Sequence, residues 1–470
     1  MNTFFMHKNI IFNNNILDKY QSKAVLCNED NYLVIAGAGS GKTLTIMAKV
    51  KYLIDNGYKE KELLCISFTN ETVNSLKEKL INNNINIDVL TFHKLSLKLL
   101  DYNYKIASSD LLKYTIDEFF ESLIYHDNTY KLLSFIDNKE QTKSMIQSFI
   151  MYMKSLNVKE DYLKRLICDR KISLDDKIYL VLILKIYLIY EEELASENKI
   201  DFDDMINYAY ENVDNINYFP YKYIVIDEYQ DTSLGKYRLI KALIDKFNIK
   251  LMTVGDDYQS IYSFTGCKLS LFTKYKKYFP KSKIIKLKYT YRNSNDIVQI
   301  SKRFVMKNRN QINKRLITNK YLNQSIYIIY SNNELESICY LIDKYENILI
   351  LGRNNSDIDK YSQLSVNKNI RFLTVHKSKG LEEENVAILN VVDDSLGFPN
   401  KIKENKILDY IRESDDLESE RRLFYVALTR TKNNVFILTK KNKESVYVKE
   451  LIKDFKYKIK IIDLDRKNFK

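Results

Sequence analysis

The chain has 470 residues, which is too long for a single hydrophobic core, so we expect at least two domains. Hydrophobic residues make up 45% of the sequence and charges of both signs are interspersed, which excludes a disordered chain. The net charge of +13 suits a polyanionic partner such as nucleic acid. The abundance of Lys, Asn, Ile and Tyr also fits an AT-rich genome, so net charge alone carries little weight.

The five cysteines are scattered and form no CxxC pair, which argues against a disulfide framework or a zinc site and indicates a reducing compartment. The longest apolar run, residues 178–190, contains Lys185 and is shorter than the roughly 20 residues that cross a bilayer. Residues 1–15 lack the apolar core and the cleavage site of a secretory signal. We therefore expect a soluble, intracellular (cytoplasmic) protein without a membrane partner.

The first half of the chain alternates predicted strands and helices. Residues 32–56 read as a strand, a glycine-rich turn and a helix, and a strand at 63–68 precedes another helix. Residues 93–200 change to long amphipathic stretches without Gly or Pro, which predicts a helical insertion. Apolar runs at 224–226 and 251–254 are each followed by acidic residues, as expected of parallel strands that end at the carboxyl edge of one sheet.

A second series of short apolar runs alternates with helical segments and implies another parallel sheet. These runs lie at residues 284–287, 348–351, 372–375, 386–389 and 435–438. The expected fold class is therefore α/β, with two domains built on parallel sheets flanked by helices and an α-helical insertion in the first. The expected limits are 1–92 and 201–275 for the first domain, 93–200 for the insertion and 276–470 for the second domain.

A phosphate-binding loop is the first motif with chemical meaning. Between the strand and the helix of residues 32–56 the chain reads Ala36-Gly37-Ala38-Gly39-Ser40-Gly41-Lys42-Thr43. In this context, backbone amides surround phosphates, Lys42 reaches the β and γ oxygens, and the Thr43 hydroxyl ligates Mg²⁺. A glycine-rich turn can simply connect a strand to a helix without binding a ligand. The Gly-Lys-Thr ending, however, favours a site for ATP or another nucleoside triphosphate.

Two adjacent carboxylates follow the apolar run at 224–226. Strand alternation sends Asp227 and Glu228 in different directions, which suits two roles. Asp227 can hold Mg²⁺ through water, while Glu228 positions and deprotonates the attacking water. The pair therefore favours hydrolysis over transfer to a bound substrate.

Further motifs follow one another along the chain. They read Leu17-Asp18-Lys19-Tyr20-Gln21, Phe68-Thr69-Asn70, Thr91-Phe92-His93, Asp227-Glu228-Tyr229-Gln230-Asp231, the segment 254–262, Tyr289-Thr290-Tyr291-Arg292, the segment 374–382 and the segment 421–430. Together with the phosphate loop, this series resembles the UvrD/Rep family of superfamily 1 helicases over nearly the whole chain. So many separate matches in family order are hard to obtain by chance.

The resemblance implies two RecA-like P-loop NTPase domains that hydrolyse ATP with Mg²⁺ at their interface. It implies an ATP-dependent single-stranded DNA translocase and DNA helicase of 3′–5′ polarity, acting on single-stranded DNA and on single-strand/duplex junctions. An RNA-directed motor stays open, because phosphate contacts and stacking do not distinguish ribose from deoxyribose. An ATP-gated DNA clamp without productive unwinding is a second alternative, against which Glu228, Gln259 and Arg430 argue.

The resemblance also assigns residues to the nucleotide. Gln21 would read the adenine edge, and Tyr291 would stack on the base. Gln259 would sense the γ-phosphate, and Arg430 would serve as an arginine finger from the opposite domain. The residues expected to touch ATP outside the P-loop are Gln21, Tyr291, Arg292, Glu382 and Arg430. The expected catalytic residues are Lys42, Glu228, Gln259, Arg292 and Arg430.

A second set of residues is implied for single-stranded DNA, with polar groups for phosphates and aromatic rings for bases. This set comprises Phe68, Thr69, Asn70, Thr91, His93, Tyr262, Phe264 and His376. Phe264 occupies the position where the family usually stacks a tryptophan, which keeps a π face in a chain without Trp. The plain alternative is that Phe264 is a core residue.

The sequence departs from the family pattern at several positions. Only twenty residues separate Arg353 from Thr374, where the family places a large fourth subdomain. That subdomain is missing or vestigial, and an accessory protein that replaces it is a candidate partner. Leu44 stands where many members have an arginine beside the base, and Thr265 replaces a basic DNA contact. The about forty residues after Arg430 lack the clusters of a fused nuclease, so we expect unwinding without cutting.

Overall fold

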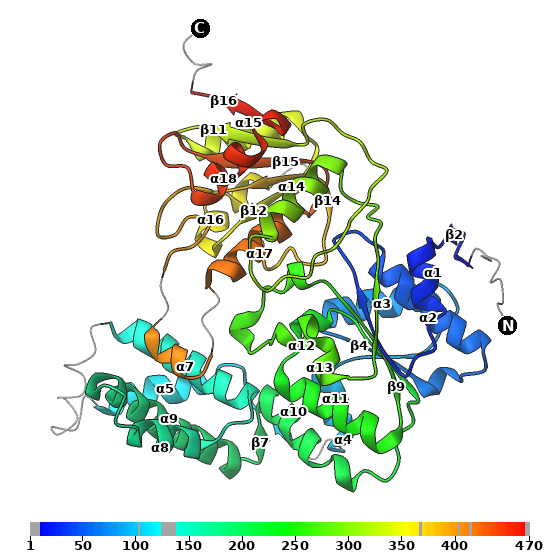
Figure 1. Ribbon diagram of the computed structural model, residues 1–470. Helices are drawn as coiled ribbons and strands as arrows, with labels where there is room; N and C mark the ends of the chain where they lie inside the picture. Colours follow the sequence, from blue (N-terminus) through cyan, green and yellow to red (C-terminus); the bar gives the residue numbers. More distant parts are fainter. Residues whose placement is uncertain are drawn as a thin grey trace.

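The computed structural model describes residues 10–101, 104–123, 138–365, 369–402, 405–412 and 416–465. Two six-stranded sheets dominate the molecule, and a group of helices lies beside the first sheet (Figure 1). The outermost parts of the expected first and second domains, residues 1–9 and 466–470, lie outside the described residues.

Every strand of the first sheet runs parallel to its neighbours, in the order β10-β3-β9-β8-β4-β5. The strands are β3 (Asn31–Ile35), β4 (Leu63–Ser67), β5 (Asp88–Thr91), β8 (Tyr223–Ile226), β9 (Lys250–Gly255) and β10 (Lys283–Lys286). The carboxyl ends of parallel strands meet at one edge of a sheet, so the motifs that follow β3, β8 and β9 lie close together.

Side chains of β3 alternate between the two faces of this sheet. Tyr32 and Val34 pack into an apolar cluster with α1, α2 and α3, whereas Leu33 and Ile35 pack into another with α4, α10 and α11. Burial on both faces explains why the strands read as continuous apolar runs. The helices are α1 (Lys19–Val25), α2 (Lys42–Asp55), α3 (Asn70–Ile81), α4 (Phe92–Leu99), α10 (Phe202–Glu211), α11 (Leu234–Phe247), α12 (Ser270–Thr273) and α13 (Tyr275–Tyr278).

The second sheet is also parallel throughout, in the order β13-β12-β14-β15-β11-β16. Its strands are β11 (Ile326–Tyr330), β12 (Asn347–Gly352), β13 (Asn369–Thr374), β14 (Glu383–Ile388), β15 (Thr431–Thr439) and β16 (Ile459–Asp463). The helices that cover it are α14 (Asn295–Val305), α15 (Glu334–Lys344), α16 (Asn355–Asp359), α17 (Asp416–Leu428) and α18 (Val446–Phe455). Two parallel sheets flanked by helices confirm the expected α/β class.

The structure corrects one strand assignment. The run at 284–287, expected in the second sheet, forms β10, which pairs with β3 at the edge of the first sheet. An apolar run predicts a strand but does not reveal which sheet the strand joins, because that choice depends on the path of the chain. The chain returns to the first sheet at β10 before it crosses to α14, so the junction lies after residue 286 and not at 275.

The helical insertion consists of α5 (Leu111–Ser122), α7 (Lys139–Ser155), α8 (Glu160–Cys168) and α9 (Leu174–Ser196), which share one apolar cluster. The two-residue strands β6 (Lys105–Ile106) and β7 (Lys199–Ile200) pair at its base. Residues 93–99, expected in the insertion, belong to α4, whose Leu95 and Leu99 pack in the core of the first domain. The other domain limits stay predictions. None of the described helices combines the length and apolarity that a membrane crossing requires.

A segment of the second domain reaches the helical insertion. The short helix η8 (Lys406–Tyr410) lies against α7 and α9, as the orange turn beside α7 in Figure 1 shows. Ile407 and Leu408 are 0% and 4% exposed within the apolar cluster of the insertion. The Tyr410 hydroxyl donates to Oδ2 of Asp176 at 2.8 Å, and Lys406 pairs with the same carboxylate. We call residues 405–412 the strap.

Shorter elements complete the described chain. They are the hairpin of β1 (Ile11–Phe12) and β2 (Asn15–Ile16) and the 3-10 turns η1 (Glu60–Glu62), η3 (Val213–Asn215), η4 (Tyr229–Asp231), η5 (Asp257–Gln259), η6 (Ser263–Thr265), η7 (Ser362–Ser365) and η9 (Lys456–Lys458). In the interval where the family places its fourth subdomain, the described residues form only α16 and η7 between β12 and β13.

Candidate nucleotide and nucleic-acid sites

The P-loop joins β3 to α2, and two of its glycines have a left-handed backbone. The φ angle is 69° at Gly39 and 76° at Gly41, a region that glycine adopts at little cost. Gly41 is the N-cap of α2, so the free amides and the positive end of the helix dipole open toward the loop. This arrangement fits phosphate groups.

The segment after β10 crosses the P-loop. The Thr290 hydroxyl donates to the carbonyl oxygen of Ala38 at 2.7 Å, and the Tyr291 amide donates to that of Gly39 at 2.9 Å. A Cβ on Gly39 would lie 2.4 Å from the Cβ of Arg292, so no other residue fits this approach. The approach brings Tyr291 and Arg292 to the loop.

The two residues expected at the adenine lie on one side of the P-loop. Gln21 is buried, its Nε2 donates to the carbonyl oxygen of Ser40 at 3.2 Å, and its Oε1 accepts from the Asp18 amide at 3.0 Å. The Tyr291 hydroxyl donates to Oδ2 of the same Asp18 at 2.8 Å, while its ring is 59% exposed. An exposed ring beside a buried amide suits a purine base.

The Lys42 ammonium lies 2.7 Å from Oε1 of Glu228. Glu228 has a φ of 52°, and its left-handed backbone turns the chain sharply after β8. Burial raises the pKa of Glu228, but Lys42 and Lys379 outweigh it and hold the pKa well below its ordinary value. Burial and the neighbouring Glu228 raise the pKa of Asp227 to about 6. Thr43 lies in the first turn of α2, which begins at this edge of the sheet, and Asp227 directly follows β8, which ends there.

The second domain contributes two arginines to the same region. Arg430 is buried, and its Nη2 donates to Oε1 of Gln259 at 2.9 Å. Arg292 donates from Nε to Oε2 of Glu382 at 2.7 Å and from Nη1 to the carbonyl oxygen of Thr429 at 3.3 Å. The structure therefore brings the expected catalytic residues together where the two domains meet.

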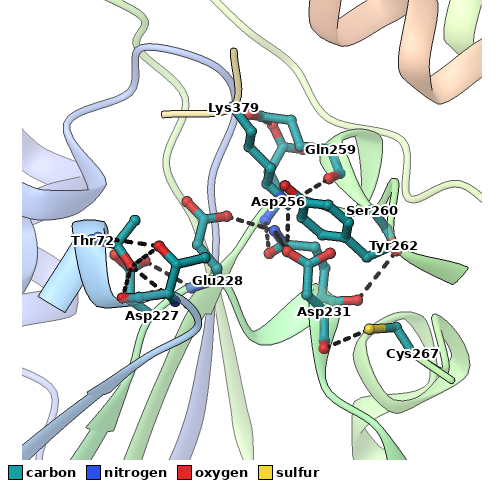
Figure 2. A network of polar contacts seen from close by, with 12 residues as sticks. Thr72, Asp227, Glu228, Asp231, Asp256, Gln259, Ser260, Tyr262, Cys267 and Lys379 are labelled. Carbon is teal, nitrogen blue, oxygen red and sulfur yellow. Dashed lines mark hydrogen bonds and ion pairs between the residues drawn. The ribbon is translucent and has the colours of Figure 1, made fainter. Parts of the chain in front are cut away.

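Lys379 lies between this region and the aromatic ring of Tyr262, as Figure 2 shows. Its ammonium pairs with Asp231 and donates to the backbone carbonyl of Gln259 at 2.9 Å. The same ammonium lies 4.8 Å from the centroid of the Tyr262 ring. The ammonium of Lys379, from the second domain, thus contacts Gln259, which lies near the expected nucleotide site, and Tyr262, which belongs to the aromatic residues expected on DNA.

The aromatic residues expected on DNA form one cluster across the two domains. The Phe68 and Tyr262 rings stack at 5.6 Å between centroids with an interplanar angle of 13°. Phe264 lies 5.8 Å from His376 and is 55% exposed, so it is not a core residue. Burial and Arg353 lower the pKa of His376 to about 4, which leaves its imidazole neutral at pH 7. Neutral rings favour stacking and hydrogen bonding over charge pairing.

A cavity of about 480 Å³ opens beside Phe68. Its lining includes Thr69 and Thr91, which cap the amino ends of α3 and α4. Helix amino ends attract phosphates. Burial lowers the pKa of His93 to about 4, so it is a neutral hydrogen-bonding group. The lining residues are Phe68, Thr69, Asn70, Glu71, Thr91, His93, Lys94, Leu97, Ile106, Phe202 and Met205.

Phe202 belongs to this lining although sequence reasoning missed it. Its ring lies 5.3 Å from that of His93 at an interplanar angle of 74°, and it is 47% exposed. The available signal was weak: an aromatic residue at the first position of α10, directly after the capping Asp201. Lys94 and Lys236 add positive charge near the Phe68 ring, with the Lys236 ammonium 4.3 Å from its centroid.

The two parallel sheets and the phosphate-binding loop define the class of two-domain P-loop proteins. The UvrD/REP helicase N-terminal domain model matches residues 17–280, and the UvrD-like helicase C-terminal domain model matches residues 354–442. The chain therefore belongs to the UvrD/REP helicase family.

Individual bacterial helicases are similar to this chain over most of its length. DNA helicase IV of Escherichia coli (strain K12) is 28% identical over 485 residues, which cover 93% of this chain and 70% of that protein. The probable DNA helicase II homolog of Mycoplasma capricolum is 28% identical, with coverages of 87% and 56%. ATP-dependent DNA helicase Rep of Buchnera aphidicola subsp. Schizaphis graminum is 27% identical, with coverages of 91% and 71%. The chain spans between 56% and 71% of the length of these relatives.

Proposed function

We propose that this chain is an ATP-dependent translocase on single-stranded DNA and a DNA helicase that moves 3′ to 5′. The observation that carries the proposal is the position of Gln259. Its side chain accepts from Arg430 of the opposite domain, and Tyr262, which stacks on Phe68, follows only three residues later. A change at the γ-phosphate would therefore reach the aromatic cluster through one short turn.

ATP and Mg²⁺ fit the residues at the domain interface. The amino end of α2 and Lys42 offer donors for phosphates, and the Thr43 hydroxyl with the Asp227 carboxylate offers the oxygen ligands that Mg²⁺ prefers. Bound Mg²⁺ would neutralise phosphate charge. Gln21 and Tyr291 are proposed to hold the adenine, because they lie together beside the loop.

Glu228 is proposed to activate the attacking water, and Arg292 and Arg430 to stabilise the charge that develops on the phosphoryl group. Glu382 holds the Arg292 side chain through the 2.7 Å contact to its Nε. Because both arginines come from the second domain, hydrolysis is expected to depend on how the domains approach each other. Cycles of approach and separation would then advance the strand.

Single-stranded DNA is proposed to lie across the cluster of Phe68, Tyr262, Phe264 and His376 and into the cavity lined by Thr69, Asn70, Thr91 and His93. The exposed Phe264 ring provides a stacking face, and the helix amino ends provide phosphate contacts. Single-strand/duplex junctions are the proposed substrates for unwinding. An accessory protein that compensates for the small interval between β12 and β13, and a cytoplasmic location, remain part of this proposal.

Steady-state ATP hydrolysis by the full chain tests the proposal. Rates are compared without nucleic acid and with single-stranded DNA, blunt duplex DNA or RNA of equal length. We expect single-stranded DNA to stimulate hydrolysis most, and Lys42→Ala to abolish it. Preferential stimulation by RNA would favour the RNA-directed motor, and ATP binding without turnover would favour the clamp. Removal of Mg²⁺ with a chelator is expected to stop hydrolysis.

A further inference from the structure

Lys314 lies between α14 and β11, outside every motif that the sequence analysis singled out. Its side chain is 1% exposed, and its ammonium pairs with Asp256 and, at 2.6 Å, with Oδ1 of Asp257. The same Nζ donates to the carbonyl oxygen of Ala36 in the P-loop at 3.1 Å and lies 3.8 Å from the centroid of the Tyr258 ring. A lysine between two second-domain elements is therefore enclosed by first-domain groups.

Asp256, which pairs with Lys314, also contacts Gln259 and Gln230. Its Oδ2 accepts from Nε2 of Gln259 at 2.6 Å, and Oε1 of Gln259 accepts in turn from Nη2 of Arg430 at 2.9 Å. Its backbone amide donates to Oε1 of Gln230 at 2.9 Å, and Nε2 of that residue donates to Oε2 of Glu228 at 2.5 Å. Figure 2 shows Asp256 among the residues of this network. The carboxylate of Asp256 thus sets which end of the Gln259 amide faces Arg430.

We propose that Lys314 is a positioning residue for ATP hydrolysis. By holding the Asp256 carboxylate it orients the amide of Gln259, and by its bond to Ala36 it ties that orientation to the phosphate-binding loop. The inference rests on the proposed function, because it concerns the rate of the same reaction.

The burial of Lys314 supports a role in orienting Asp256 and Gln259 rather than a role in stabilising the fold. Removing an ammonium and two carboxylates from water costs free energy that their attraction only partly offsets, so a buried ion pair is weak support for a stabilising role. Fixed geometry, in contrast, is what a reacting site needs, since a displacement of about 1 Å can lower a rate by about 100-fold. A side chain that connects Ala36 with the Asp256 carboxylate provides such fixed geometry.

Lys314→Met, Gln259→Ala and the double variant test the proposal in the full chain with saturating single-stranded DNA. We expect Lys314→Met to lower kcat by about 10- to 100-fold and to change KM for ATP by less than about threefold. The double variant is expected to be no slower than Gln259→Ala, because both changes act through one amide. A double variant whose loss equals the product of the two single losses would overturn the inference, as would an unchanged kcat in Lys314→Met.

Charge balance and folding are controlled by two further variants. The double variant Lys314→Met with Asp257→Asn restores the local charge balance and leaves Asp256 in place. If its kcat equals that of the unchanged chain, Lys314 only neutralises charge, and the inference is overturned. Lys49→Met is the matched control, because Lys49 is equally buried and donates to the carbonyl oxygens of Val25 and Cys27. We expect its kcat to be unchanged. Absence of hydrolysis by the unchanged chain would instead refute the proposed function.

Discussion

The ammonium nitrogen of Lys42 lies 2.7 Å from Oε1 of Glu228, so the P-loop lysine and the residue proposed to activate water form an ion pair. The β and γ oxygens of a nucleotide would compete with Glu228 for the donors of this ammonium. Phosphate binding is therefore expected to release Glu228. Loss of its nearest cation raises the pKa of Glu228 toward that of a useful base. The ion pair would thereby couple arrival of the substrate to activation of the proposed base.

Glu228→Gln is expected to trap ATP without hydrolysing it. The amide keeps the shape of the side chain but accepts no proton, so kcat should fall at least about 100-fold. ATP affinity should be retained or increased, because Lys42 no longer pairs with a carboxylate. Single-turnover hydrolysis and binding of a fluorescent ATP analogue measure the two effects. Lys42→Ala is the matched control and should lose affinity; hydrolysis at the original rate by Glu228→Gln would remove the assigned role.

Phe264→Ala is expected to weaken binding to single-stranded DNA and to reduce its stimulation of ATP hydrolysis. Loss of one stacked ring costs about 1–3 kcal/mol, which corresponds to about 5- to 150-fold in Kd. Fluorescence anisotropy with labelled oligo(dT) measures the affinity. Tyr218→Ala is the control, because Tyr218 is 77% exposed and lies outside the aromatic cluster. Equal Kd values for the two variants would place DNA elsewhere.

Stability should rise with pH above about 8 because of Lys49. Burial lowers the pKa of Lys49 to about 8, while the unfolded chain keeps the proton up to about 10.5. Between these values the unfolded state binds more protons, so the free energy of unfolding increases with pH. Relative to Lys49→Met, the increase between pH 8 and 9.5 should be at most about 2 kcal/mol. Urea unfolding at both pH values measures it, and parallel behaviour of the two chains would contradict the burial of a titrating Lys49.

Leu408→Ala should loosen the strap from the helical insertion. Leu408 is 4% exposed among apolar side chains of the insertion, and truncation of a buried Leu typically costs about 2–5 kcal/mol. Faster amide exchange in residues 405–412 is the expected result. Leu417→Ala, at a site that is 75% exposed, should leave the exchange unchanged. Unchanged exchange in Leu408→Ala would show that the strap does not depend on this contact.

Short motifs allowed much of the molecule to be predicted from the sequence. The P-loop, the carboxylates after β8 and the turn at 257–259 are local patterns, and parallel strands bring their ends to one edge. The two sheets and the family followed from the order of these patterns. The sequence left open whether Phe264 is a core residue, and its 55% exposure in the structure rejects that alternative.

Features that depend on the path of the chain were not predictable. The β10 strand reads like any other apolar run, and only its pairing with β3 assigns it to the first sheet. Lys314 reads as one of many lysines, and its burial depends on two acidic residues that lie more than fifty positions earlier. The apolar residues of the strap read as an ordinary amphipathic turn. In each case the partner is distant in sequence, so local periodicity carries no signal.

Directional movement on single-stranded DNA is the central claim, and displacement of streptavidin from end-biotinylated oligonucleotides tests it most directly. The full chain with ATP and Mg²⁺ is mixed with oligo(dT) that carries biotin at either the 5′ or the 3′ end. Movement from 3′ to 5′ predicts rapid loss of streptavidin from the 5′ end and none above background from the 3′ end. Hydrolysis of ATP without displacement from either end would contradict translocation, and displacement only from the 3′ end would contradict the proposed polarity.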